Sequence, residues 1–464
     1  MTAVFSEENI KTAIDVLKQR FGERVSTAEA VRAHHTHTTT RMGAQLPDAV
    51  VFANETADVA DIVSICAEHR CPIIPFGVGS SLEGHVNAAH GGISIDMNNM
   101  NKVLAVNAED LDAVVQPGVT REALNEYLRD TGLFFPIDPG ANASLGGMAA
   151  TRASGTNAVR YGTMKDNIIA LEAVMADGRV IRTGTRAKKS SAGYDLTRLL
   201  IGSEGTLGVI TELTVRLQGI PEKIAGGICS FPSVEAACNA VIETIQFGIP
   251  VARIELLDPL QVKAVNNYSN LDLPEEPLLL LEFHGTENSV REQSELFAGI
   301  ASEYTSHPFQ WTTDPEERNK LWKARHDAYW ACLSLMPGAE GLSTDVCVPI
   351  SRLAECVEET RKDIIETGLT APLIGHVGDG NFHVLPLCMP DDIETRDKIT
   401  AFAGRLSDRA IAMGGTCTGE HGIGQGKIKY LRRELGDSVD VMAAIKSSLD
   451  PDNIMNPGKI LPQG

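Results

Sequence analysis

Two histidines flank an Asp-Gly pair in the segment LIGHVGDGNFHVL, residues 373–385. The apolar runs on both sides of Asp379 and Gly380 predict a β-hairpin with a two-residue type I′ turn. With the turn centred there, His376 lies directly opposite His383, and opposed residues of a hairpin have Cβ atoms about 4.5–5.5 Å apart. Two imidazoles at that separation can bind one metal ion. A wider loop also keeps both histidines near its mouth, and the alternative is a pair that hydrogen-bonds to each other or to water.

Glu420 and His421 offer further ligands in the glycine-rich segment GGTCTGEHG, residues 414–422. Glycines in a turn let the backbone approach another group closely. Together, His376, His383 and Glu420 form a set of two imidazoles and one carboxylate that leaves coordination positions open, as a catalytic metal needs. The set suits both Zn²⁺ and Mn²⁺. A metallohydrolase and a non-catalytic metal- or anion-binding protein are the alternatives to a redox enzyme on these residues alone.

Arg325 is the candidate for binding an anion. Helical spacing places it on one face with Trp322 and Tyr329,. An arginine on such a face is either an edge residue with its charged end in water or a clamp for a carboxylate. The bidentate geometry of a guanidinium suits the carboxylate of a 2-hydroxy acid.

Glycine-rich loops in the first half of the chain are typical of cofactor sites. The segment PFGVGSSLEG, residues 75–84, follows a short strand, and such a loop can turn several N–H groups toward a pyrophosphate,. Small residues at 140–147 and 154–157 would let the backbone lie against a flat cofactor. Tight packing of turns explains the same residues equally well.

Periodicity and punctuation predict the elements that carry these residues. Helices are predicted at residues 7–21, 57–70, 120–130, 233–247, 287–303, 315–335, 351–367, 392–413 and 437–449. Strands are predicted at residues 73–75, 93–97, 103–106, 113–116, 168–175, 208–217, 251–257, 278–284 and 343–348, with the hairpin at 373–387. Residues 218–221, where Gly and Pro follow a strand, mark a domain boundary,. Beyond it, strands and helices mix without regular βαβ alternation, which predicts an α+β domain with an antiparallel sheet.

Composition narrows the class of protein. A chain of 464 residues predicts two or three domains, and a net charge of −20 disfavours nucleic acid and anionic membrane surfaces as partners,. No apolar run approaches the roughly 20 residues of a membrane helix, and no secretory signal opens the chain, so we expect a cytoplasmic protein,. The nine cysteines include no CxxC pair, which argues against iron–sulfur and c-type haem sites and favours reduced, mostly buried thiols,. His34, His35 and His37 have no carboxylate nearby in sequence, and we expect them at the surface or between domains.

Long motifs follow one another over nearly the whole chain. They are IIPFGVGSSLEGH (73–85), FFPIDPGANASLGGMAATRASGTNAVRYGTMKDNI (134–168), KKSSAGYDLTRLLIGSEGTLGVITELTVRL (188–217), PVARIELLD (250–258), STDVCVPISRL (343–353), GHVGDGNFH (375–383), GTCTGEHGIGQGK (415–427) and NPGKIL (456–461). With these motifs the chain resembles the FAD-linked D-lactate dehydrogenases of the vanillyl-alcohol-oxidase-like, PCMH-type flavoprotein superfamily (the FAD-binding oxidoreductase/transferase type 4 family).

The resemblance implies an α+β fold in which residues 1–219, joined by 450–464, form a two-part PCMH-type FAD-binding domain. Residues 220–449 would form an α+β cap domain with an antiparallel sheet, the substrate site and the metal site. Some relatives attach FAD through a histidine, and His85 closes the first loop, but the lactate-type relatives do not need that link and we expect non-covalent FAD. The residues expected to line FAD are Gly77, Val78, Gly79, Ser80, Ser81, Leu82, Pro139, Gly140, Ser144, Gly147, Ser154, Gly155, Asn157, Tyr161, Gly162, Glu204, Gly205, Val209, Ile210 and Asn456.

The resemblance also assigns roles at the second site. It implies that His376, His383 and Glu420 hold the divalent metal, that His421 is the general base, and that Arg325 binds the substrate carboxylate. The expected reaction is oxidation of a short D-2-hydroxy acid to the 2-oxo acid by hydride transfer to the flavin.

The expected substrate is D-lactate, with pyruvate as product. Relatives that act on dicarboxylates carry a Lys near the position of Ser343 and an Asn near that of Leu385, and this chain has neither. A D-lactate oxidase that uses oxygen, a glycolate dehydrogenase and a D-2-hydroxyglutarate dehydrogenase are the alternatives within the resemblance. The electron acceptor stays open among quinone, cytochrome, electron-transfer flavoprotein and oxygen, as do a homodimer and a peripheral place at the inner membrane.

Overall fold

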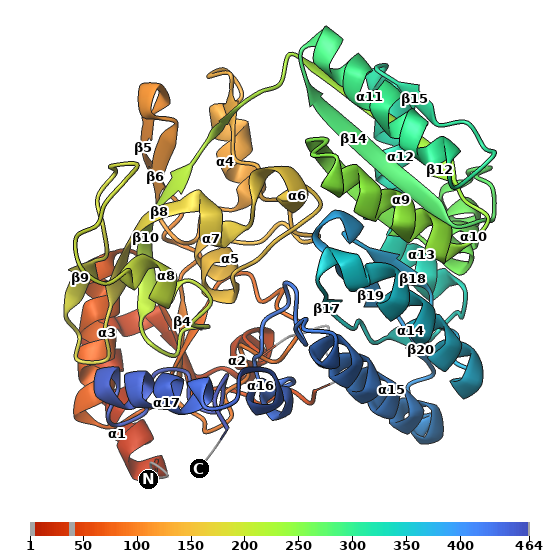
Figure 1. Cartoon of the computed structure of the whole chain (residues 1–464). Helices are drawn as coiled ribbons and strands as arrows, with labels where there is room; N and C mark the ends of the chain where they lie inside the picture. Colours follow the sequence, from red (N-terminus) through yellow and green to blue (C-terminus); the bar gives the residue numbers. More distant parts are fainter. Residues whose placement is uncertain (1–4, 37–41, 463–464) are drawn as a thin grey trace. The chain divides into compact units, whose positions relative to one another are not determined.

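The computed structural model describes residues 5–36 and 42–462, which form two compact units (Figure 1). The first unit takes the residues up to Ser154, Gly162–Ile220 and the residues from Glu420 onward. The second unit takes Gly155–Tyr161 and Pro221–Gly419. The boundary after Ile220 falls within the predicted segment 218–221. The chain rejoins the first unit at Glu420, earlier than the expected residue 450, and the short segment 155–161 groups with the second unit.

The first unit contains two main sheets and a two-stranded pair. One sheet has the order β1-β2-β4-β3, in which β2 and β3 run parallel to β4 while β1 pairs antiparallel with β2. The other is antiparallel, with the order β5-β6-β10-β8-β9, and β11 pairs with β7. The strands are β1 (Val25–Ser26), β2 (Ala49–Phe52), β3 (Ile73–Phe76), β4 (Ile93–Asp96), β5 (Val103–Asn107), β6 (Asp112–Val115), β7 (Leu133–Phe134), β8 (Ile168–Val174), β9 (Val180–Arg182), β10 (Val209–Arg216) and β11 (Gln218–Gly219).

Helices of the first unit form where apolar faces and caps coincide. In α1, Ser6 accepts a hydrogen bond from the Asn9 N–H at the start, Gly22 ends the helix with φ +58°, and the predicted apolar face is buried,. The helices are α1 (Glu7–Phe21), α2 (Glu29–His34), α3 (Thr56–Glu68), α4 (Arg121–Leu128), α5 (Leu145–Thr151), α7 (Met164–Asn167), α8 (Leu196–Leu200), α16 (Ile428–Leu435) and α17 (Ser438–Leu449), with 3₁₀ turns η1 (Gly22–Arg24) and η2 (Ala108–Asp110). The predicted helices at 7–21, 57–70, 120–130 and 437–449 are therefore confirmed.

The second unit is built on an antiparallel sheet of seven strands in the order β15-β12-β14-β13-β18-β19-β17, as predicted for this half of the chain. A separate pair joins β16 and β20. The strands are β12 (Lys223–Ser230), β13 (Val251–Leu257), β14 (Leu278–Gly285), β15 (Gln310–Thr312), β16 (Glu340–Gly341), β17 (Val346–Cys347), β18 (Leu373–Gly375), β19 (Asn381–Val384) and β20 (Leu387–Cys388). The helices are α6 (Ala158–Tyr161), α9 (Val234–Gln246), α10 (Pro259–Ser269), α11 (Glu287–Ser302), α12 (Pro315–His326), α13 (Ala328–Ser334), α14 (Leu353–Thr367) and α15 (Ile393–Ala412), with 3₁₀ turns η3 (Ile350–Arg352) and η4 (Val377–Asp379).

The two faces of this sheet carry different neighbours. On one face, alternate strand residues such as Ile254 and Leu256 join a core with buried side chains of α9, α11, α14 and α15. On the other face, Leu257 and Ile374 pack in a smaller core with residues of α10, α12 and α13. Because side chains alternate along a strand, Glu255 lies on this second face, which also receives α12. That face is the frame of the candidate site.

The structure departs from the predicted elements at several places. The predicted helix at 315–335 is two helices, α12 and α13, separated at Asp327. Strand β12 was not predicted because Gly226 and Gly227 interrupt its apolar pattern. The structure requires glycine at 227, since a Cβ there would lie 2.5 Å from the Gln310 carbonyl oxygen on the neighbouring strand. Helix α10 was also missed, although Asp258 caps it and a proline opens it,.

His35 corrects one sequence expectation. Its side chain is buried, and its Nε2 atom lies 2.9 Å from Asp96 Oδ2 on β4. The carboxylate comes from a residue 61 positions away, so the residues next to His35 carry no sign of it. His37 lies outside the described residues. None of the nine cysteines, all of which lie in the described residues, forms a disulfide, and eight of them are buried, as expected.

Candidate active site

The connection between β18 and β19 brings His376 and His383 together, but not through the predicted turn. Ile374, rather than His376, lies opposite His383 in the ladder, so the two-residue turn is wrong. Five residues connect the strands, with η4 inside the loop and Gly380 at φ +78°. The longer loop still places the two imidazole rings 5.5 Å apart between centroids, nearly perpendicular.

Each of the two rings is oriented through its Nδ1 atom. His376 Nδ1 lies 2.7 Å from Glu255 Oε1, and His383 Nδ1 lies 3.0 Å from the backbone oxygen of Thr344. Both side chains are buried. Because a carboxylate and a carbonyl only accept hydrogen bonds, Nδ1 carries a proton in both rings. In the neutral imidazole this leaves Nε2 to offer the lone pair that a metal requires.

Glu420 and His421 follow directly after Gly419, the last residue of the second unit. A Cβ at Gly419 would lie 2.2 Å from Asn381 Nδ2, so only glycine lets the chain pass strand β19 this closely,. One ligand atom each of His376, His383 and Glu420 lies within 4.8 Å of the others, which is the predicted metal set. The fold therefore brings together the three residues that the sequence predicted as metal ligands.

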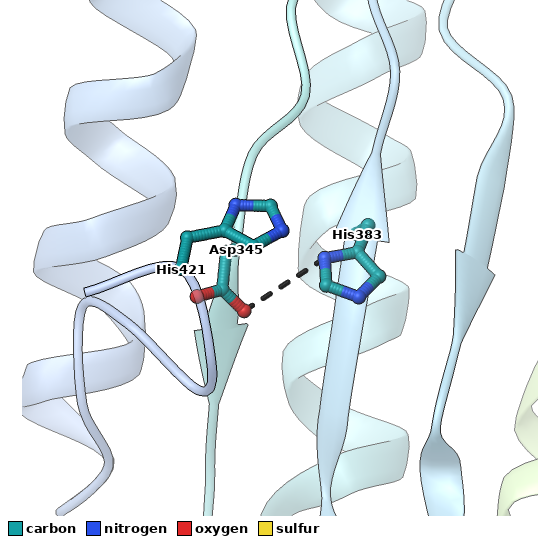
Figure 2. Close-up of side chains that lie close together, drawn as sticks. All are labelled: Asp345, His383 and His421. Carbon is teal, nitrogen blue, oxygen red and sulfur yellow. Dashed lines mark ion pairs between the residues drawn. The ribbon is translucent and has the colours of Figure 1, made fainter. Parts of the chain in front are cut away.

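A second group of potential ligands shares His383 and was not predicted. Figure 2 shows Asp345, His383 and His421 facing one another, and their ligand atoms also lie within 4.8 Å. The fully buried Asp345 lies 3.7 Å from His383 Nδ1 and accepts hydrogen bonds from Asn381 and Thr418 at 2.8 Å. An aspartate directly before the apolar residues of β17 was the signal that could have identified it.

Arg325 lies on α12 and is joined to His376 by Glu255, which the sequence patterns also missed. Its Nε atom donates to Glu255 Oε2 at 2.6 Å, while the other oxygen faces His376. Glu255 is fully buried, which alone would raise its pKa, but His376 and Arg325 outweigh burial and lower the pKa below its ordinary value,. Trp322 and Arg325 lie on α12 while Tyr329 lies on the next helix, α13, and the guanidinium over the Trp322 ring is that of Arg253.

The donor set fits a divalent metal. Two oriented imidazoles and a carboxylate are the ligands of catalytic Zn²⁺ sites, and Glu255 and the Thr344 carbonyl are outer partners of the kind that fix such ligands,. Mn²⁺ accepts the same atoms. The arrangement can bind an oxygen ligand of a small anion and place a guanidinium nearby.

The predicted cofactor loop in the first unit fits an anionic cofactor. Within the described residues, the backbone N–H groups of residues 78–82 donate no hydrogen bond to the protein, and the buried Ser81 hydroxyl has no partner. The loop leaves β3 beside α5, where a Cβ at Gly77 would lie 2.3 Å from Ser144 Oγ. Such a concentration of unpaired donors suits a pyrophosphate.

Other residues predicted to line FAD gather around the start of the same loop. Asn456 donates from Nδ2 to the Glu204 carbonyl at 2.7 Å, and a Cβ at Gly205 would lie 3.0 Å from Pro75. Glu204 adopts φ +53° and accepts N–H groups of Ile423 and Gly424 at 2.7 and 2.8 Å. Burial would raise the Glu204 pKa, but His85 and these N–H groups lower it.

The remaining predicted residues occupy several elements. Pro139 and Gly140 precede α5, Gly147 lies within it, and Val209 and Ile210 begin β10 in the first unit. Ser154 and Gly162 adjoin the segment 155–161, which belongs to the second unit. In that segment Asn157 accepts from Arg253 at 2.8 Å, and the Tyr161 hydroxyl lies 2.7 Å from His284 Nδ1. Their contact with FAD stays a prediction.

Comparison with known proteins identifies the family. Residues 220–460 match the family described as FAD linked oxidases, C-terminal domain, and residues 47–184 match the FAD binding domain. The chain belongs to the FAD-linked oxidases. A Danio rerio protein named probable D-lactate dehydrogenase, mitochondrial, is 50% identical over 95% of this chain and 89% of its own length. An Arabidopsis thaliana protein named D-lactate dehydrogenase [cytochrome], mitochondrial, is 48% identical over 90% of this chain and 74% of its own.

Solved structures establish the fold class of this FAD-linked oxidase. The structure of p-cresol methylhydroxylase with substrate bound aligns with a TM-score of 0.79 at 17% identity, covering 98% of this chain and 97% of that one. The predicted PCMH-type, α+β fold is thereby confirmed. Within the residues that the structure describes, no helix has both the length and the apolar character needed to cross a membrane. The expected cytoplasmic location stays a prediction.

Proposed function

We propose that this FAD-linked oxidase oxidises D-lactate to pyruvate with non-covalent FAD and a divalent metal held by His376, His383 and Glu420. The observation that carries the proposal is the close approach of these three ligands, within 4.8 Å, with Arg325 linked to the same cluster through Glu255. The names of the relatives from Danio rerio and Arabidopsis thaliana supply the substrate class.

Arg325 binds the substrate carboxylate in this proposal. Its Nε atom is engaged by Glu255, and within the described part of the chain its two terminal nitrogens donate no hydrogen bond. Two parallel N–H groups match the two oxygens of a carboxylate. The buried Glu255 keeps the guanidinium from turning away, so the fork stays directed at the anion.

His421 accepts the proton of the substrate hydroxyl. The C2–H bond breaks with its electron pair, the O–H proton goes to the imidazole, and the C2–O bond becomes a carbonyl. Bound FAD would accept the hydride, and a divalent ion would lower the pKa of the hydroxyl, so that an imidazole suffices as base. The ligand atoms of Asp345, His421 and His383 lie within 4.8 Å of one another, and Asp345 would help to orient His421 in this proposal (Figure 2).

The side chains at positions 343 and 385 favour a short, monocarboxylic substrate. Leu385 is 5% exposed and packs with Cys332 and Leu387, while Ser343 contributes only a neutral hydroxyl. A second carboxylate placed near these side chains would lose its hydration without gaining a charged partner. We therefore propose that D-lactate is preferred to D-2-hydroxyglutarate.

The proposed electron acceptor is a cytochrome. The Arabidopsis thaliana relative carries this acceptor class in its name. Reduced FAD would pass its electrons to the cytochrome rather than to oxygen, and the chain's own cysteines contain no CxxC motif for a cluster of its own,.

Anaerobic reduction of the purified protein tests the proposal. We expect a yellow protein that releases free FAD on denaturation and whose visible absorbance bleaches with D-lactate, but not with L-lactate or D-2-hydroxyglutarate. Chelation should abolish D-lactate bleaching while FAD stays bound, and added Zn²⁺ or Mn²⁺ should restore it. A flavin that D-lactate does not bleach refutes the activity. Full turnover after complete metal removal, checked by elemental analysis, refutes the metal.

A further inference from the structure

Glu255 occupies the position from which one side chain can reach both parts of the candidate site. It lies on β13, whose pairing with β18 sets Leu256 opposite Gly375 and Leu257 opposite Ile374. The same register continued by one residue sets Glu255 opposite His376, which immediately follows β18. Residues at opposed positions of an antiparallel pair have Cβ atoms about 4.5–5.5 Å apart, within reach of a carboxylate and an imidazole.

The carboxylate of Glu255 uses its two oxygens for two different partners. Oε1 lies 2.7 Å from His376 Nδ1, and Oε2 accepts from Arg325 Nε at 2.6 Å. The side chain has no exposed surface, so water does not compete for either oxygen. A buried carboxylate with two charge-assisted partners is held in one orientation and holds them in return.

We propose that Glu255 is a positioning residue that keeps His376 in its metal-binding tautomer and Arg325 in its carboxylate-binding orientation. The inference rests on the proposed function, because it assigns metal and substrate to these two partners. One rigid carboxylate would then set the spacing between the metal ligand and the guanidinium, the two groups that a single 2-hydroxy acid must contact together. His383 receives the equivalent support from the Thr344 backbone oxygen, so its orientation does not depend on Glu255.

The variant Glu255→Gln separates the effect of Glu255 on the tautomer of His376 from its effect on the orientation of Arg325. Arg325 Nε–H can only donate, so the Gln oxygen turns to Arg325 and the amide nitrogen faces His376. His376 Nδ1 must then accept, which moves its proton to Nε2 and removes the lone pair that would bind metal. We expect a metal affinity lower by about 10- to 100-fold, the usual effect of losing such an outer partner. At saturating metal, the KM for D-lactate should stay close to that of the wild type.

The measurement is competition for Zn²⁺ or Mn²⁺ between a chromophoric chelator and the FAD-loaded protein, which needs no turnover. Asp363→Asn is the matched control, because Asp363 is also a buried carboxylate of the second unit and bridges Arg405 and Arg409. It should lose stability but keep metal affinity. Glu255→Asp, which shortens the side chain and weakens both hydrogen bonds, should lower metal affinity and raise KM.

Unchanged metal affinity in Glu255→Gln overturns the inference, as does a loss of affinity in Asp363→Asn of equal size. Should Glu255→Gln fail to fold, wild-type metal affinity and KM in Glu255→Asp overturn it instead. A wild-type protein that binds no metal, or whose flavin D-lactate does not reduce, contradicts the proposed function before any variant is compared. The two failures are therefore distinguishable.

Discussion

Replacement of Arg325 by lysine changes the shape of a cation while keeping its charge. The guanidinium uses Nε for Glu255, at 2.6 Å, which leaves two terminal nitrogens for a substrate carboxylate. An ammonium is a single point charge and cannot offer a planar fork. If the lysine nitrogen stays with the buried Glu255, the substrate loses both hydrogen bonds. If it turns to the substrate, Glu255 keeps only His376.

The expected effect follows from the hydrogen bonds that the lysine cannot make to the substrate. A hydrogen bond to a charged group contributes about 1.5–3 kcal/mol, so the loss of even one of them raises KM about 10- to 150-fold. The carboxylate keeps its charge throughout the reaction. Its interaction with Arg325 should therefore stabilise bound substrate and transition state alike, and kcat should fall much less than KM rises.

Steady-state kinetics with D-lactate and an artificial acceptor measure both constants. Arg318→Lys is the matched control, since Arg318 lies on the same helix and donates instead to the Ile224 carbonyl at 3.2 Å. This control should leave KM unchanged. The reasoning is refuted if Arg325→Lys has wild-type KM, or if kcat falls while KM does not change, because either result removes Arg325 from ground-state carboxylate binding.

Two further predictions test separate parts of the structure. His421→Ala should lower kcat by about 10²- to 10⁴-fold, the usual contribution of a general base, with little loss of FAD; unchanged turnover removes His421 from proton transfer. Asp258 caps α10, and burial raises its pKa from the ordinary 3.8 to about 6 although the backbone N–H groups of Gln261 and Leu260 act in the opposite direction. The folded protein therefore favours protonated Asp258. The resulting contribution of this residue to the free energy of unfolding is complete below pH 4 and is lost as pH rises through 6. Asp258→Asn keeps the cap without the charge, so its gain in stability should approach about 3 kcal/mol above pH 6 and vanish toward pH 4. Urea unfolding across this range measures the gain, and a gain that does not vary with pH contradicts the assigned burial cost.

Local sequence signals predicted the regular elements well where caps and periodicity agree. In α1, a serine cap, an apolar face and a terminal glycine all indicate the same fifteen-residue helix. Prediction failed where tertiary contacts replace local signals. Gly226 and Gly227 weaken the strand pattern of β12, yet the neighbouring chain leaves no room for a larger residue at Gly227,.

In the candidate site, too, local sequence signals predicted some residues, while others depend on tertiary contacts. His376, His383 and Glu420 could be predicted because ligand residue types cluster in two short segments. Glu255 could not, because its partners His376 and Arg325 are 121 and 70 residues away. The pairing of β13 with β18 brings His376 to it, and the packing of α12 on the same sheet face brings Arg325. An isolated glutamate in a strand of apolar residues was the one local sign, since a buried carboxylate requires partners.

The failure of the predicted turn explains why the site works as a unit. A two-residue turn would have placed His376 within the ladder, directly opposite His383, with both backbones committed to strand hydrogen bonds. In the structure β18 ends at Gly375, and His376 leaves the strand with φ −81° and ψ +65°. The ring is thereby close to His383 while its Nδ1 atom meets Glu255 on the neighbouring strand. Because β13 packs its opposite face into the larger core of the unit, the carboxylate that orients both His376 and Arg325 is fixed by the sheet rather than by a loop. The loop thus supplies the ligand, and the sheet supplies its orientation.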